Sequence, residues 1–286
     1  MTKLATAPIT WGVIEVPDWG IQLKPEQVLQ DMTGLGFSAT EFGPEGFLPD
    51  DPEGRSRVLK EHGLSAVGGF FPAVLHREDQ DPLPQIHKEL EAYAAAGADV
   101  MVLSANSGKA GYDTRPDLSD AEWDTLLRNL NTINEAAAEV GVTATLHPHM
   151  GTLVQTPEET ERVLAGSTIG LCVDTGHYTL AGGDPLDLVR NHPDRVAHIH
   201  LKDVDLSVAR RVAEGEFDYR EGCRRGMYQA LGDGDAKIAD IVAGLRDAGY
   251  GGWYVLEQDT VLDTEDDAAR AYEDARRSSE FIRELI

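Results

Sequence analysis

The chain lacks several features that would place it in other protein classes. It has two cysteines, Cys172 and Cys223, without CxxC or zinc-finger spacing. Apolar residues make up 41% of its 286 residues, and no uninterrupted apolar run approaches the ~18 residues of a membrane-spanning helix. Residues 1–10 lack the apolar core of a signal peptide. These absences favour a reduced, cytoplasmic protein with no membrane partner.

Positive charge is also scarce. The chain has 25 basic and 50 acidic residues, which gives a formal net charge of -25. Binding to a phosphate backbone depends on lysine and arginine displacing counterions. We therefore expect no nucleic-acid partner, whereas the possibility of a homo-oligomer stays open.

Short apolar runs alternate with longer amphipathic stretches along the whole chain, which favours a parallel α/β fold. No GxGxxG or P-loop follows the first run, so a closed barrel is preferred over a doubly wound sheet. We predict a single (β/α)8 TIM barrel over residues 1–286. The predicted strands are Ala5–Thr10, Ser38–Phe42, Ser65–Phe70, Asp99–Leu103, Val142–Leu146, Ile169–Val173, Val196–Leu201 and Trp253–Leu256.

Helix boundaries carry local signals as well. Ser119 and Thr156 are each followed three residues later by glutamate, which predicts capping boxes. Five glycines stand shortly before predicted strands, where left-handed helix C-caps are expected. They are Gly36, Gly63, Gly97, Gly141 and Gly249.

One irregular stretch, Val204–Asp235, follows the seventh predicted strand. A connection of this length is expected to be a lid, a binding loop or an interface. It holds five arginines interleaved with acidic residues, so local pairing and a role at the barrel mouth are both open. The arginines are Arg210, Arg211, Arg220, Arg224 and Arg225.

Histidines and carboxylates follow four consecutive predicted strands. In barrels of this kind the chemistry lies at the carboxyl ends of the strands, so these side chains should converge. Singly, a histidine there is more often structural, Asp174 could cap a helix and Glu257 could be a solvated carboxylate. Together they predict a metal site, and mixed nitrogen and oxygen ligands suit Mn²⁺, Co²⁺, Fe²⁺ or Zn²⁺ better than Ca²⁺. The residues are His147, His149, Asp174, His177, His198, His200, Lys202, Asp203 and Glu257.

The runs VDTGH (173–177), HIHLKD (198–203) and YVLEQD (254–259) resemble the xylose-isomerase-like barrels, which include sugar isomerases, epimerases and endonuclease IV. Further runs are similar to the inosose dehydratases of inositol catabolism. These are ITWG (9–12), TEFGPEGFLP (40–49), LHPHMGT (146–152) and GMYQALGDGD (226–235). The similarity runs in order from about residue 8 to residue 284.

Carried over residue by residue, the resemblance implies four metal ligands: His147, Asp174, His200 and Glu257. The superfamily usually has glutamate, in a Leu-Glu-Pro run, where this chain has Leu146-His147-Pro148. The departure weakens any transfer of the isomerases' two-carboxylate mechanism. We expect Mn²⁺ or Co²⁺, with Zn²⁺, Fe²⁺ and Mg²⁺ left open.

The reaction that the resemblance implies is removal of water from 2-keto-myo-inositol or a related cyclic polyol ketone. A metal acting as a Lewis acid would stabilise the enediolate, while a base and an acid move protons. The candidates for proton transfer are Glu41, His149, His177 and Lys202. The candidates for contact with the substrate are Trp11, Phe70, His198 and Asp203, although Asp203 could instead orient His198 or Lys202, and the aromatic residues could equally be core.

Other functions remain open on the sequence. A sugar isomerase or epimerase, or a barrel that cleaves C-glycosides, would use the same enediolate chemistry. A DNA-repair nuclease would need more metal ligands and a basic surface, which the net charge opposes. A non-catalytic sugar-binding protein would not need the ligand set.

Overall fold

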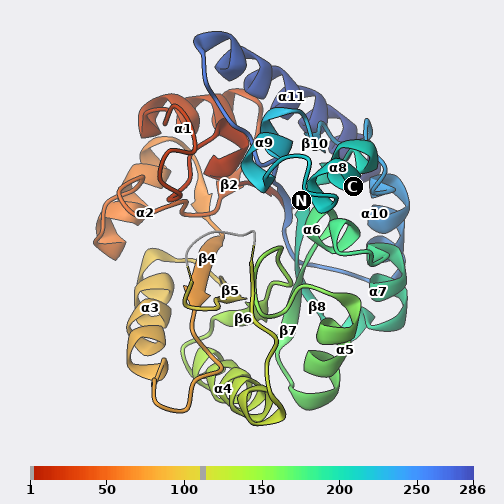
Figure 1. Cartoon of the computed structure of the whole chain (residues 1–286). Helices are drawn as coiled ribbons and strands as arrows, with labels where there is room; N and C mark the ends of the chain where they lie inside the picture. Colours follow the sequence, from red (N-terminus) through yellow and green to blue (C-terminus); the bar gives the residue numbers. More distant parts are fainter. Residues whose placement is uncertain (1–2, 110–113) are drawn as a thin grey trace.

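The computed structural model describes residues 3–109 and 114–286 and forms a barrel of parallel strands surrounded by helices (Figure 1). The strands of the barrel sheet are β1 (Leu4–Thr6), β2 (Ala39–Thr40), β3 (Ser65–Ala66), β4 (Gly68–Ala73), β5 (Val100–Ala105), β6 (Thr143–Leu146), β7 (Gly170–Asp174), β8 (Val196–Leu201) and β11 (Tyr254–Leu256). The predicted barrel is confirmed.

The barrel closes through a strand that bends. The sheet order is β3-β2-β1-β11-β8-β7-β6-β5-β4, with every pairing parallel. The two ends of this order, β3 and β4, are separated in the chain by Val67 alone, so they act as one strand of the barrel. This strand pairs with β2 through its first half and with β5 through its second half. The nine strand segments found in the described residues are thus the eight staves of a closed barrel.

Helices follow the staves and cover the outside of the barrel (Figure 1). Their bounds are α1 (Pro25–Gly34), α2 (Pro52–Glu61), α3 (Leu83–Ala96), α4 (Asp120–Glu139), α5 (Pro157–Gly166), α6 (Thr175–Leu180), α7 (Pro185–Asn191), α10 (Ile238–Asp247) and α11 (Glu265–Leu285). Within the described part of the chain no helix has the length and hydropathy of a membrane span.

The predicted helix boundaries are confirmed. Ser119 and Thr156 form capping boxes on α4 and α5, and Thr264 forms a further one on α11. The five predicted glycines have φ between 74° and 80°. This left-handed conformation ends the preceding helix at little cost for a residue without Cβ.

Alternation along each strand decides what faces the barrel interior. On β8, Ile199 and Leu201 pack into the main core beneath the helices, whereas His198 and His200 point inward. The lower interior is filled by small apolar side chains in two separate clusters. These include Ala5, Ala39, Val67 and Val255 in one, and Val100, Val102 and Cys172 in the other. Charged inward positions therefore begin only near the carboxyl ends of the strands.

The predicted first strand is too long at its carboxyl end. Strand β1 stops at Thr6, and the 3-10 helix η1 spans Pro8–Trp11. Proline at position 8 has no N–H to give to a strand ladder and has φ preset for a turn. Trp11 thereby leaves the barrel mouth and is fully buried in the core, where η1 packs against α11.

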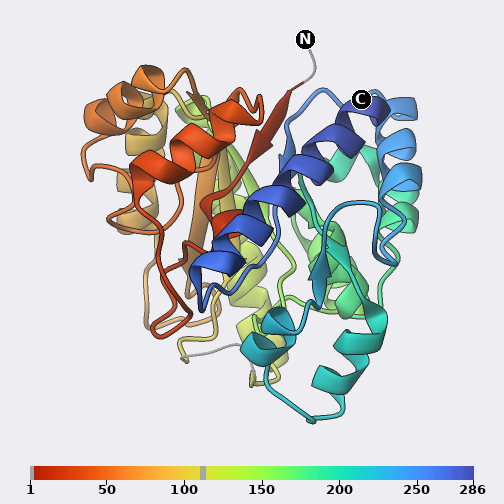
Figure 2. The same ribbon diagram turned by 90° about the horizontal axis from the view of Figure 1, so that it is seen from above.

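The stretch from 204 to 235 is ordered rather than irregular. After β9 (Asp203–Val204) come α8 (Leu206–Ala213), α9 (Tyr219–Arg224) and β10 (Tyr228–Gln229), and β10 pairs antiparallel with β9. Figure 2 shows α8 and α9 at the end of the barrel opposite the amino terminus. Tyr219, Cys223, Met227 and Tyr228 belong to the main core, so the segment is an integral part of the fold.

Closure of the barrel depends on the absence of a side chain at position 68. A Cβ added at Gly68 would lie 1.7 Å from the carbonyl oxygen of Val100, on the neighbouring strand. We predict that Gly68→Ala lowers the free energy of unfolding by at least ~2 kcal/mol, because β4 must shift against β5. Urea denaturation measures the loss. The control is Gly34→Ala in α1, where nothing lies within 4 Å of the added Cβ and a gain of ~0.5–1 kcal/mol is expected. Equal stability of the two variants would contradict this account.

Candidate active site

Four side chains from neighbouring strands meet at the carboxyl end of the barrel. His147 follows β6, Asp174 ends β7, His200 lies in β8 and Glu257 follows β11. One ligand-type atom from each lies within 4.8 Å of the corresponding atoms of the others. The structure therefore brings together the four residues that the sequence predicted as metal ligands. All four continue the alternate positions whose side chains point into the barrel.

One ring nitrogen of each of the two imidazoles of this group faces the same space. Nδ1 of His147 lies 2.9 Å from the carbonyl oxygen of Pro148, so Nδ1 carries the hydrogen and Nε2 faces Asp174 at 3.7 Å. Nε2 of His200 donates to the Glu41 carboxylate at 3.0 Å, and Nδ1 faces Glu257 at 3.1 Å. Histidines that bind metals usually donate their other N–H to a carbonyl or carboxylate in this way. Burial and the neighbouring His149 lower the pKa of His147 to about 3, so its ring is neutral.

Asp174 divides its two oxygens between the fold and the site. Oδ1 accepts the backbone N–H groups of Gly176 and His177, both at 2.8 Å, and so caps α6. Oδ2 is buried and lies 3.6 Å from Nδ1 of His200, too far for a hydrogen bond. Both readings of Asp174 from the sequence, helix cap and member of the cluster, hold at once. The buried Oδ2 atom fits the position of an oxygen ligand.

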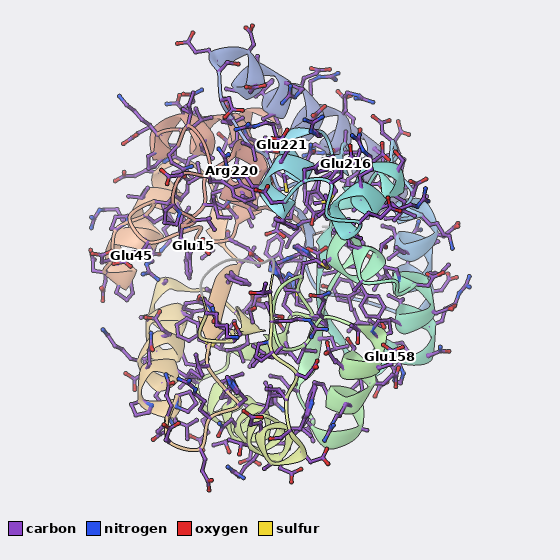
Figure 3. The ribbon with its side chains drawn as sticks, viewed as in Figure 1. Glu15, Glu45, Glu158, Glu216, Arg220 and Glu221 are labelled. Carbon is purple, nitrogen blue, oxygen red and sulfur yellow. The ribbon has the colours of Figure 1, made fainter. Side chains whose placement is uncertain are left out.

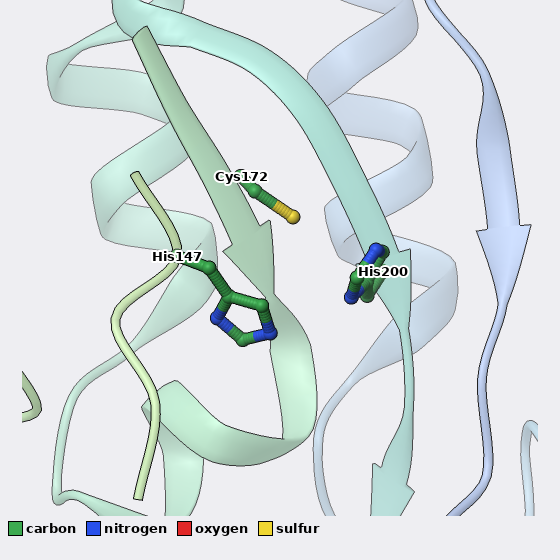
Figure 4. A group of neighbouring side chains, drawn as sticks. All are labelled: His147, Cys172 and His200. Carbon is green, nitrogen blue, oxygen red and sulfur yellow. The ribbon is translucent and has the colours of Figure 1, made fainter. Parts of the chain in front are cut away.

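Cys172 lies next to this group on β7. Figure 4 shows its sulfur on the same side as the rings of His147 and His200, and the three residues satisfy the same 4.8 Å criterion. Burial raises the pKa of the Cys172 thiol to about 11, which keeps it protonated. With Val100 and Val102 it forms the apolar floor beneath the polar cluster.

Glu41, predicted as a proton-transferring residue, lines the cavity, but its carboxylate is engaged by two histidines. It follows β2, and its Oε1 accepts hydrogen bonds from Nε2 of His198 at 2.9 Å and of His200 at 3.0 Å. Burial favours the neutral acid, but His200 and His198 outweigh it and lower the pKa of Glu41 to about 2. A carboxylate so engaged is a weak base. Glu41 is placed to orient His200.

Lys202 is fully buried among carboxylates. Its Nζ lies 2.6 Å from Asp259, 2.9 Å from Glu257 and 3.3 Å from Asp174. Burial opposes its charge, but Asp174, Asp259 and Glu257 outweigh burial and hold the pKa of Lys202 well above its usual value. Three carboxylates, those of Asp174, Glu257 and Asp259, thus face one ammonium, and a fourth, that of Glu41, lies against His198 and His200. The surplus negative charge fits a divalent cation among the ligands.

A cavity of about 940 Å³ opens above the cluster. Its wall includes His147, His149, Lys202, Glu257, Asp259 and Phe70. The ring of Phe70 lies against His147 and His149, with centroids 6.2 and 5.8 Å away. His177 is 1% exposed and lies behind this wall, with Nε2 3.1 Å from Nζ of Lys202. Of the predicted proton-transfer residues, Glu41, His149 and Lys202 line the cavity, and the Glu41 carboxylate is engaged by His198 and His200.

Three residues predicted to touch the substrate are used elsewhere. Trp11 is in the core, because η1 turns the chain away from the mouth. His198 lies one inward step below His200 and is bonded to Glu41. Asp203 accepts the backbone N–H groups of four residues, and contacts neither His198 nor Lys202 through its carboxylate. The four are Val204, Gly232, Gly234 and Ala236.

Three residues that reach the cluster were not predicted from the sequence. Asp259 was part of the quoted run YVLEQD but was not assigned, although it stands two positions after Glu257. Tyr219 and Tyr228 come from the 204–235 segment, and the Tyr219 hydroxyl donates to Asp259 at 2.7 Å. The alternation of side chains along a strand was a local signal for Asp259, because residues two positions apart point to the same side. The tyrosines carried none, because their position depends on how the segment folds back.

The arginines of that segment are mostly paired locally. Arg211 binds Glu216, and Arg225 binds Glu221. Arg224 bridges Glu221 and Asp263, and Arg220 donates to the carbonyl oxygen of Trp19. Glu216, Arg220 and Glu221 are marked in Figure 3, where Glu15 and Glu45 lie apart from them on the α1–α2 side of the barrel. Arg220 and Arg224 therefore tie the segment to the rest of the chain, whereas Arg211 and Arg225 are paired within it.

Comparison with known proteins agrees with this architecture. A family model described as xylose isomerase-like TIM barrel matches residues 29–285. The chain belongs to the xylose isomerase-like TIM barrel family. The resemblance stated from the sequence is confirmed at this level.

Proteins similar to this chain include inosose dehydratases. The rhizopine catabolism protein MocC of Rhizobium meliloti is 34% identical over 89% of this chain and 81% of its own length. An inosose dehydratase of Geobacillus thermodenitrificans is 31% identical over 99% of this chain and 96% of its own length. These relatives support the expectation of a hydro-lyase.

Two solved structures show the same fold at lower identity. One is an L-ribulose 3-epimerase, with a TM-score of 0.71 and 16% identity, covering 99% of this chain and 94% of that chain. The other is the IOLI protein, solved with a zinc atom, with a TM-score of 0.71 and 13% identity, covering 100% of this chain and 99% of that chain.

The new role of Asp203 is testable. We predict that Asp203→Asn lowers the free energy of unfolding by about 3 kcal/mol, because an amide group replaces one acceptor facing buried N–H groups. Hydrogen exchange of residues 231–236 should accelerate. The control, Asp233→Asn, changes an exposed carboxylate paired with Arg277, and a change within ~0.5 kcal/mol is expected. Unchanged stability together with a raised KM would instead indicate that Asp203 contacts the substrate.

Proposed function

We propose that this member of the family is a divalent-metal-dependent hydro-lyase that removes water from 2-keto-myo-inositol or a closely related cyclic polyol ketone. Full-length similarity to an inosose dehydratase supports the reaction class and the link to inositol. The cavity of about 940 Å³ has room for a six-membered ring.

The observation that carries the proposal is the histidine at position 147. An enzyme that inverts a stereocentre beside a carbonyl, or moves the carbonyl, by two-carboxylate proton transfer needs a carboxylate at this strand end. Here Nδ1 of His147 is held by the Pro148 carbonyl and Nε2 faces Asp174. Because this neutral ring serves as a ligand-type group, proton transfer falls to other residues. This favours elimination over epimerisation.

We propose that His147, Asp174, His200 and Glu257 hold the metal, with Mn²⁺ or Co²⁺ as the expected ion. Their convergence, the buried Oδ2 atom of Asp174 and the surplus of carboxylates support this assignment. The IOLI protein, which has the same fold, was solved with a zinc atom, and this supports a metal in this chain. A bound ion would act as a Lewis acid toward the substrate ketone and acidify the adjacent C–H.

His149 and Lys202 are our candidates for the proton transfers. Burial and the nearby Lys202 lower the pKa of His149, so its ring is a neutral base at physiological pH. Lys202 is a charged ammonium and faces the same cavity. We assign His149 to removal of the proton beside the ketone and Lys202 to protonation of the departing β-hydroxyl. One proton goes to His149, one leaves Lys202, and the products are water and an enolised dione.

The reaction is tested directly with metal-depleted protein reloaded with Mn²⁺ or Co²⁺. With 2-keto-myo-inositol, we expect rising ultraviolet absorbance from the enolised dione. Asp174→Asn should lose both metal and activity, and His149→Gln should keep its metal while kcat falls by ~10²-fold or more. Ketohexoses form the comparison panel. Epimerised ketohexose without dehydration of 2-keto-myo-inositol would assign the site to an epimerase instead.

The role of Glu41 separates orientation from catalysis. We predict that Glu41→Gln weakens Mn²⁺ binding by ~10–100-fold, because His200 loses the carboxylate that fixes its ring. Competition with a chelator measures the affinity. Glu45→Gln, at another position on the cavity wall, should bind Mn²⁺ like the unmodified protein. Full metal affinity with a low kcat in Glu41→Gln would restore Glu41 as a proton-transfer residue.

A further inference from the structure

Two buried hydroxyl groups of the 204–235 segment lie at the site. The proposed chemistry uses neither of them. Tyr219 lies on α9 and Tyr228 on β10, with 6% and 3% of their surfaces exposed. Their hydroxyl oxygens are 2.7 Å apart. Both come from a part of the chain distant in sequence from the metal-site candidates on β6, β7 and β11.

These hydroxyls complete a closed ring of hydrogen bonds around Lys202. Tyr219 donates to Oδ2 of Asp259 at 2.7 Å, and Oδ1 of Asp259 accepts from Lys202 at 2.6 Å. Nζ of Lys202 lies 3.1 Å from Nε2 of His177, and Nδ1 of His177 lies 3.3 Å from the Tyr228 hydroxyl. The Tyr219–Tyr228 contact closes the ring.

The donors in this ring can be arranged in one way. An ammonium only donates, so Lys202 donates to Asp259 and to Nε2 of His177. Nδ1 of His177 must then carry the ring hydrogen and donate to Tyr228. Tyr228 in turn donates to Tyr219, and Tyr219 donates to Asp259, which as a carboxylate only accepts. The same order follows from the other end of the ring. Asp259 orients the Tyr219 hydroxyl, Tyr219 then accepts from Tyr228, and Tyr228 is left to accept from Nδ1–H of His177.

We propose that Tyr219 and Tyr228 are positioning residues that fix the Nδ1–H tautomer of His177 and thereby hold the Lys202 ammonium in place beside the cavity. The proposal rests on the function given above, in which Lys202 protonates the leaving group. Lysine has a flexible stem of four carbons and three rotatable donors, so its ammonium needs external partners to hold one direction. Asp259 and His177 supply two, and each is held by one tyrosine.

The kinetic test uses Tyr219→Phe, Tyr228→Phe and the double variant. Each single change opens the same ring, so we expect kcat to fall at least ~10-fold, while KM and Mn²⁺ content stay within about twofold of the unmodified protein. The double variant should be no slower than the slower single variant, because groups in one network are not additive. The control is Tyr254→Phe, a buried tyrosine on the outer face of β11 whose hydroxyl makes no hydrogen bond. Unchanged kcat in either single variant, or multiplicative losses in the double variant, would overturn the proposal.

A second measurement needs no substrate and no variant of the tyrosines. Nitrogen-15 NMR of the imidazole groups distinguishes the two neutral tautomers, and the His177 signals are identified by their loss in His177→Gln. We expect the Nδ1–H tautomer in the unmodified protein and a mixture in Tyr228→Phe. The Nε2–H tautomer in the unmodified protein would refute the ring. If the protein does not dehydrate 2-keto-myo-inositol, the proposed function fails, but the tautomer still decides this inference.

Discussion

A surplus of buried negative charge is the constraint around which the site is built. Asp174, Glu257 and Asp259 surround Lys202 at 2.6–3.3 Å, and Glu41 lies close by against His200. Carboxylates removed from water are costly unless they are paired and hydrogen-bonded. Three of the four have a partner that belongs to the fold: a helix N-terminus for Asp174, a histidine pair for Glu41 and a tyrosine for Asp259. Glu257 lies against His200 and Lys202. The barrel fold holds these carboxylates close together despite their mutual repulsion.

Strand parity makes this concentration of charge compatible with a stable core. The inward positions below the site hold alanine, valine and cysteine, and the outward positions hold large aliphatic side chains under the helices. The charged groups begin one step further along each strand, where the parallel strands end. A shift of one residue in β8 would turn His198, His200 and Lys202 toward the helices and place Ile199 and Leu201 in the site. Register and function are therefore fixed by the same pairing.

The predicted barrel and the convergence of four side chains could be read from the sequence because both depend on local patterns. The period of two within each strand places His147, Asp174, His200 and Glu257 at the same end. The errors arose where a contact depends on closure of the barrel or on a long return of the chain. Glu41 meets His198 and His200 from a different stave, and Asp203 meets Gly232 and Gly234 only after β10 has folded back. Trp11 was misplaced for a local reason, since Pro8 ends the first strand early.

Lys202 lies between the proposed metal ligands and the 204–235 segment. Its ammonium is shared between Asp174 and Glu257 on the side of the proposed metal and Asp259 on the side of the 204–235 segment. A divalent cation held by Asp174 and Glu257 repels the ammonium and reduces its share of their charge. Lys202 then depends more on Asp259 and His177, and through them on Tyr219 and Tyr228. Because coupling between two sites is reciprocal, a segment that holds Lys202 on the side of Asp259 also leaves Asp174 and Glu257 freer to bind the cation. If a cation is bound as proposed, docking of the segment and occupation of the metal site would favour each other through this one buried charge.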